Sequence, residues 1–107
     1  MAFDIEEILD GMLGAAAGVL SSEWPKVQAC VKRVFEEERS ALETIAKARL
    51  DGEIDDVELK SQLADEQEVL KAALLVCKLK GKLAAQKAVN AALTVLSEAI
   101  KSALKIL

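Results

Sequence analysis

The chain has 107 residues, of which 52% are apolar, 30% charged and only 3% aromatic. Ala and Leu together supply 34 residues, a composition typical of helices rather than sheets. The chain has no His, which excludes Ser-His-Asp catalysis, Cys-His catalysis and a di-iron site of the Glu-x-x-His type. We therefore expect a single all-helical domain over residues 1–107 that is not an enzyme, with no metal, no cofactor and no small-molecule substrate.

The two cysteines, Cys30 and Cys77, are too few for a four-cysteine zinc site. Both fall on apolar helix faces, so we expect buried, reduced thiols that act as small hydrophobic side chains. A disulfide or redox pair is the alternative. Acidic residues near the start (Asp4, Glu6, Glu7) stand where a secretory signal needs positive charge. We expect a cytoplasmic protein, with export by a leaderless route left open.

The first predicted helix covers residues 4–20. Asp4 followed by Glu7 is a capping-box pattern, with Asp4 at the N-cap. Glycine within a helix costs about 1 kcal/mol relative to Ala, so three of them indicate close approach to another helix. These expected packing or assembly contacts are Gly11, Gly14 and Gly18. A membrane-inserting segment is the alternative, although the uncharged stretch 11–22 is too short to span a bilayer.

The second predicted helix covers residues 23–50. Ser22 is the expected cap, and Pro25 lies in the first turn, where its missing N–H does no harm. Together these residues favour a bend before the helix. On the outer face, Glu43 and Lys47 have the spacing of a stabilising ion pair.

A turn at Asp51 and Gly52 ends this helix, and Asp55 with Glu58 forms the next capping box. The segment resembles the second half of an EF-hand calcium loop. Lys47 and Arg49 would occupy the first two ligand positions, however, and cations do not coordinate Ca²⁺, so we interpret it as a helix–turn–helix. Helices are then predicted over 55–80 and 82–107, separated only by Gly81, with one continuous helix as the alternative.

If the helices 23–50 and 55–80 form an antiparallel hairpin, the numbers of facing residues sum to about 105. Leu42 then faces Leu63, Phe35 faces Leu70, and Val31 faces Leu74. The polar residues that interrupt the two apolar seams fall in one layer, formed by Glu38, Gln67 and, as a further member, Glu66. We interpret this layer as fixing the register, with Gln67 donating to Glu38. A carboxylate site for metal binding or proton transfer is the minor alternative.

Two arrangements remain open for the outer helices. If both fold back on the hairpin, the fold is an up-down four-helix bundle. If both continue straight, Leu9 faces Leu96 and Ile5 faces Ile100 in a hairpin roughly 75 Å long, which must oligomerise to bury its apolar faces. The final helix is apolar on most sides, and its expected packing or assembly contacts are Leu93, Leu96, Ile100 and Leu104.

The charge is −10 over residues 1–68 and +6 over residues 69–107. We expect the two halves to neutralise each other within the chain or between subunits, and we expect no nucleic-acid partner. The sequence therefore predicts a non-enzymatic, self-associating structural or scaffold subunit of a homo-oligomer or filament. The alternatives are a membrane-active helical protein that forms pores or binds anionic lipid, and a small regulatory bundle that binds another protein.

Overall fold

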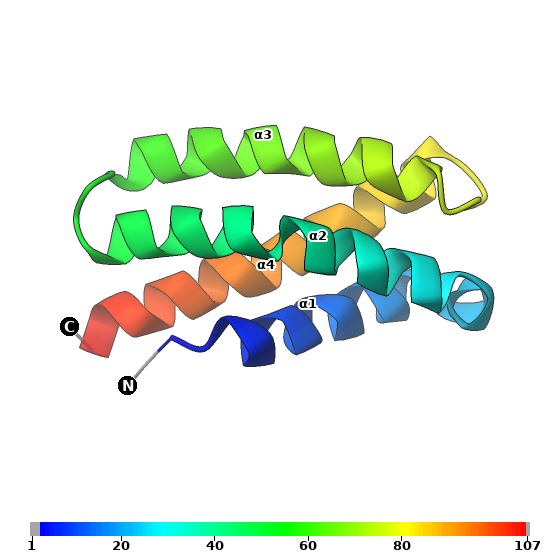
Figure 1. Ribbon diagram of the computed structural model, residues 1–107, viewed down its shortest axis with the longest axis horizontal. Helices are drawn as coiled ribbons and strands as arrows, with labels where there is room; N and C mark the ends of the chain where they lie inside the picture. The colour runs from blue at the N-terminus through cyan, green and yellow to red at the C-terminus, as the bar shows by residue number, and fades with distance from the viewer. Residues whose placement is uncertain (1–2, 107) are drawn as a thin grey trace.

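A computed structural model describes residues 3–106 and shows an all-α fold (Figure 1). Four α-helices alternate in direction, so the predicted fold class is confirmed in its bundle form. Their bounds are α1 Ile5–Leu20, α2 Trp24–Leu50, α3 Asp56–Leu75 and α4 Lys82–Ile106. Leu107, the last residue of the predicted final helix, lies outside the described residues.

The chain reverses between α1 and α2 at a short 3₁₀ turn, η1 (Ser21–Glu23). No non-helical residue intervenes, so Ile5 to Leu50 is one helical run, and the described part of the chain has three such runs. Ser21 interrupts this run with φ 51°, a conformation that bends the chain. A straight run would measure about 69 Å at 1.5 Å per residue, whereas the whole molecule is 40 Å long. The long straight hairpin is therefore wrong.

The start of α1 and the bend before α2 follow the prediction in part. Asp4 is the N-cap of α1, and its carboxylate accepts a hydrogen bond from the backbone N–H of Glu6 at 3.0 Å. Pro25 lies in the first turn of α2 as expected, but no side chain caps that helix. Ser22 lies inside the 3₁₀ turn instead, so its predicted capping role is wrong.

The turn between α2 and α3 has the predicted chemistry. Gly52 has φ 80°, a left-handed conformation that suits glycine. The Asp55 carboxylate accepts from the N–H of Glu58 at 2.9 Å, and the Asp55 N–H donates to the Glu58 carboxylate at 3.4 Å, which completes the capping box. The Glu43–Lys47 ion pair is also present, at 3.4 Å.

Contacts at the two ends of the hairpin agree with the expected register. Arg49 Nε lies 2.8 Å from Asp56 Oδ1, a pair whose numbers sum to 105. At the other end of the hairpin, the backbone N–H of Lys80 donates to the Glu23 carboxylate at 3.1 Å, with a sum of 103. The facing of α2 and α3 could therefore be derived from their apolar spacing.

The end of α3 differs from the prediction. The helix ends at Leu75, five residues before the predicted bound, and it is not continuous with α4. Lys78 has φ 62° and Gly81 has φ 156°, so a non-glycine residue takes the left-handed conformation in this loop. The loop returns the chain toward α1, and Figure 1 shows it at the same end of the bundle as the α1–α2 turn.

The core lies between all four helices, and α1 packs most extensively against α4. The largest fully buried side chains include Phe35 and Leu42 from α2, Leu70 from α3, and Leu9 and Leu96 from the α1–α4 pair. Wide apolar faces on α1 and α4 thus bury each other within one chain. Within residues 3–106, no helix combines the length and the apolar character required to cross a bilayer.

Candidate interaction groove

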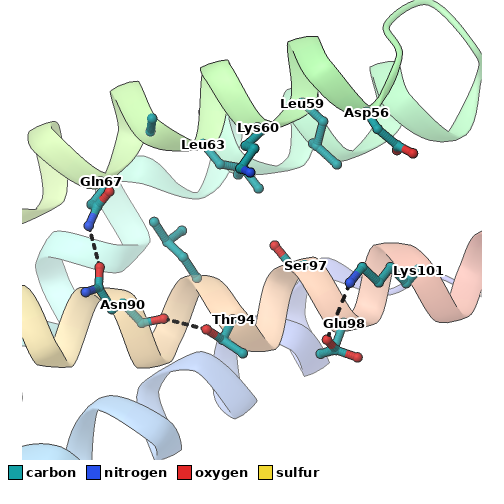
Figure 2. Close-up of a pocket in the computed structure, with 12 residues that line it drawn as sticks. Asp56, Leu59, Lys60, Leu63, Gln67, Asn90, Thr94, Ser97, Glu98 and Lys101 are labelled. Carbon is teal, nitrogen blue, oxygen red and sulfur yellow. Dashed lines mark hydrogen bonds and ion pairs between the residues drawn. The ribbon is translucent and has the colours of Figure 1, made fainter.

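A groove lies between α3 and α4, near the α2–α3 turn, with a volume of about 700 Å³ (Figure 2). It exists because α3 and α4 lie close together at the loop end and diverge toward the α2–α3 turn (Figure 1). Its floor is apolar and comes from both helices, with the side chains Leu59, Leu63, Ala64 and Leu93. Ala64 is exposed, whereas Leu63 and Leu93 are only 9% and 8% exposed. The groove therefore offers a shallow apolar strip.

Charged side chains of both signs line this apolar strip. On α3 they are Asp56 and Lys60, and on α4 they are Glu98 and Lys101. Lys101 Nζ lies 3.9 Å from Glu98 Oε2, and both side chains are largely exposed. An exposed pair of this kind contributes little to the stability of the chain itself. Its charges remain free to contact a partner.

A polar bridge crosses the groove where the two helices approach each other. The Gln67 amide donates to the Asn90 side-chain oxygen, and Thr94 Oγ1 donates to the Asn90 backbone carbonyl at 2.9 Å (Figure 2). The predicted bond from Gln67 to Glu38 is wrong, because Gln67 faces α4 rather than α2. Sequence reasoning missed Asn90, although it lies on the same narrow polar strip of α4 as Lys87 and Thr94.

The second part of the predicted polar layer is a pair of carboxyl groups, Glu38 on α2 and Glu66 on α3. Burial raises the pKa of the Glu66 carboxyl from its ordinary value of 4.5 to about 7. A hydrogen bond with Glu38 and the charges of Glu38 and Asp65 act in the same direction. Glu66 Oε1 is buried and has no hydrogen-bond partner within the described chain. Below about pH 7 this pair therefore holds a proton between α2 and α3.

The described residues contain no cluster of three His, Cys, Asp or Glu side chains arranged to hold a metal ion. Glu38 and Glu66 form only a pair, and neither of them lines the groove.

The three glycines of α1 do not form one packing surface. A Cβ at Gly11 would lie 3.3 Å from Val95 Cγ1 of α4, so this position is a close helix contact as predicted. A Cβ at Gly14 or Gly18 would meet nothing within 4 Å, and both residues are exposed. The prediction that another helix packs closely on Gly14 and Gly18 is therefore wrong within one chain, since a side chain at either position would meet open space.

The predicted contacts of α4 lie inside the chain's own core. Leu96 and Ile100 are fully buried, and Leu93 is nearly so. Leu104 is half-buried and packs against the same core. These residues serve helix packing within one molecule, which leaves them little surface for contact with a second.

Cys30 and Cys77 form a disulfide with a Cα–Cα distance of 5.7 Å, so the expectation of reduced thiols is wrong. The bond joins α2 to the loop that follows α3, across a sequence separation of 47 residues. The disulfide could have been predicted from the sequence. The residue numbers 30 and 77 sum to 107, close to the value of about 105 expected for facing residues of α2 and α3. The helix register alone is therefore enough to bring the two thiols close together.

The acidic and basic halves do not neutralise each other as expected. The cross-helix ion pairs in the described chain are Arg39–Glu6 and Arg49–Asp56, both within residues 1–68. Within residues 3–106, Lys71 is the one basic residue beyond position 68 that pairs with an acid of the front half, and its partner Glu68 is a local neighbour at 3.1 Å. The expected neutralisation within one chain is therefore wrong, because the helix directions separate most of these charges.

Comparison of the chain with family models, with curated proteins and with solved structures finds no match. Function is therefore argued from the geometry alone.

Proposed function

We propose that this protein is a non-enzymatic, self-associating helical subunit whose α3–α4 groove binds a second copy of the same chain. One observation carries the proposal: the groove joins an apolar floor to charged side chains of both signs. Apolar centres with polar borders are the usual anatomy of protein–protein interfaces. A structural or scaffold role follows from such association, and it requires no cofactor and no small-molecule substrate.

A second copy of the chain complements the charged side chains along the groove better than a partner that carries charges of only one sign. Each wall of the groove carries one acidic and one basic side chain, Asp56 with Lys60 on α3 and Glu98 with Lys101 on α4. In a two-fold dimer each copy presents the same surface to the other. Lys60 and the exposed Glu98–Lys101 pair of each copy are then available to opposite charges of the other copy, whereas Asp56 keeps its own partner, Arg49.

Val57 supplies an apolar group that can enter the groove of the second copy. It is 78% exposed on α3 and lies seven residues before Ala64, on the same helix face. Because Ala64 lines the groove, Val57 stands at the edge of the apolar floor. A two-fold dimer centred between these residues buries Val57 against Ala64 on the groove floor of its partner.

The compartment in which this association takes place stays a prediction. The expectation from the sequence is the cytoplasm. The Cys30–Cys77 disulfide weighs against it, because disulfides persist mainly in oxidising environments. This contrast supports the export route that the sequence left open.

Sedimentation velocity of the full chain from micromolar to millimolar concentration tests the proposal. We expect a dimer that dissociates on dilution. Ala64→Glu places a charge on the floor, and because Ala64 is exposed, the helix itself tolerates the change. We expect this variant to remain monomeric with an unchanged helical circular-dichroism spectrum.

Ala72→Glu is the matched control, since Ala72 is an exposed Ala of α3 that does not line the groove. We expect it to dimerise like the unmodified chain. A monomeric unmodified chain at millimolar concentration overturns the proposal. Equal dimerisation of Ala64→Glu and the unmodified chain also overturns it.

A further inference from the structure

One end of the bundle combines exposed aliphatic side chains with exposed lysines. We call it the loop-end surface; it includes the end of α1, the end of α3, the loop 76–81 and the start of α4. Its exposed aliphatic residues are Val19, Leu75, Val76 and Leu83, of which Val76 is 78% and Leu83 62% exposed. Between the last two of these come the exposed lysines Lys78, Lys80 and Lys82.

The fold holds this surface in place through α2. The Cys30–Cys77 disulfide fixes the beginning of the loop, and the bond from the Lys80 N–H to the Glu23 carboxylate fixes its later part. Neither the aliphatic side chains nor the lysine side chains take part in the disulfide or in this hydrogen bond. They are therefore presented outward from an anchored loop.

The alternating helix directions make this end strongly basic. Residues 11–35 and 69–97, which form this end and the adjoining middle of the bundle, contain eight Lys and Arg side chains and a single acid, Glu23. The rest of the chain has 17 acids and six bases, so its charge is −11 against +7 here. Lys78, Lys80 and Lys82 form no ion pair within the described chain.

From this arrangement we propose that the loop-end surface docks the intact bundle onto an anionic lipid bilayer. Each lysine near such a surface is attracted to the acidic headgroups, and exposed aliphatic residues gain by entering the boundary with the acyl chains. Trp24 begins α2 at this same end and is half-buried, in the amphipathic position that Trp favours at membrane interfaces. The acidic end and the groove then face away from the lipid.

Lipid fits this surface better than nucleic acid does. Seven of the eight bases are Lys, and Arg33 is the single Arg, so bidentate contacts to phosphate are few. Val76 and Leu83 lie among these lysines. Contact with the charged backbone of a nucleic acid would bring them no favourable free energy of apolar burial. A bilayer offers both anionic headgroups and apolar depth.

Vesicle binding of the full chain tests this proposal, with the fluorescence of the sole tryptophan as the signal. Vesicles of phosphatidylcholine with 30% phosphatidylglycerol are compared with pure phosphatidylcholine at low salt. We expect binding and a blue shift of Trp24 emission with the anionic vesicles only. Lys78→Gln with Lys82→Gln is expected to weaken binding about 30-fold, from the attraction of about two lysines.

Two further variants separate charge from apolar contact. Lys47→Gln with Lys105→Gln makes the same charge change on exposed lysines toward the opposite end, and we expect nearly unchanged binding. Val76→Ser with Leu83→Ser keeps every charge, and we expect weaker binding that is lost at high salt. The proposal is overturned by absent binding to anionic vesicles, by equal losses in the two lysine variants, or by tighter binding to duplex DNA than to vesicles at equal phosphate. Unchanged binding of the serine variant also overturns it.

Discussion

Cys30 of α2 and Cys77 of the loop after α3 are joined by a disulfide at the end of the bundle where α3 and α4 approach each other. The bond holds the chain at the point where α3 ends without a glycine cap. It also anchors the loop that returns the chain to α4. Because the α2–α3 register alone brings these two cysteines together, the bond ties the hairpin itself rather than deciding how α1 and α4 pack on it.

Removal of this bond by Cys30→Ser with Cys77→Ser is expected to destabilise the fold. Closing 47 residues restricts the unfolded chain, and loop-closure entropy sets an upper limit of about 4 kcal/mol for the loss. Urea unfolding of the oxidised protein, the reduced protein and the double variant measures it. The last two are expected to agree. Two thiols that react freely with Ellman's reagent in the untreated folded protein would contradict the assignment.

Apolar spacing was enough to predict the α2–α3 hairpin, and local chemistry was enough for its turn. Gly52, Asp55 and Glu58 act on their own backbone neighbours, so their roles do not depend on the rest of the fold. A bend before α2 was predicted from Ser22 and Pro25, but the positive φ angles of Ser21 and Lys78 were not predictable in this way. Both residues lie where the chain folds back between helices, and neither is of a type that favours a positive φ angle.

The groove could not be predicted from the sequence, because it depends on how far α3 and α4 diverge. The apolar pattern of each helix shows which face is buried but not where two faces separate. The Gln67–Asn90 bridge shows the same limit, since the α2–α3 register placed Gln67 opposite Glu38. The hydrogen-bond partner of Gln67 comes instead from a third helix, α4.

Glu66 is expected to make stability depend on pH. Its pKa is raised to about 7 in the folded chain and returns to its ordinary value of 4.5 on unfolding. Between these values the folded chain binds more protons than the unfolded chain, so the free energy of unfolding falls as pH rises from 4.5 to 7. Because the carboxyl is partly exposed, we expect a discounted loss of about 1 kcal/mol by about pH 8.

Glu66→Gln mimics the protonated side chain and tests this expectation. At about pH 8 the variant is expected to be more stable than the unmodified chain by about 1 kcal/mol, and at about pH 4.5 the two are expected to be equal. Urea titrations at both values measure the difference. Glu53→Gln, an exposed change in the α2–α3 turn, is the control. An equal gain in both variants at the higher pH would count against the buried carboxyl pair as the cause.

Gly14→Ala is expected to stabilise the bundle by about 1 kcal/mol, because a Cβ there meets nothing and Ala favours the helix. Gly11→Ala is expected to gain less, since its Cβ presses on Val95 at 3.3 Å. Thermal and urea unfolding of the two variants compares them directly. A larger gain for Gly11→Ala would show that α1 does not approach α4 as closely as the structure has it.

The central claim is that the α3–α4 groove receives a second copy of the chain. Methyl NMR on a mixture of isotope-labelled and unlabelled protein tests it most directly, because only contacts between copies give filtered cross-peaks. If the groove receives a second copy, we expect intermolecular cross-peaks from the Val57 methyl groups to Leu59, Leu63 and Ala64. A mixture that shows no such cross-peaks at millimolar concentration, or shows them only to residues outside the groove, would contradict it.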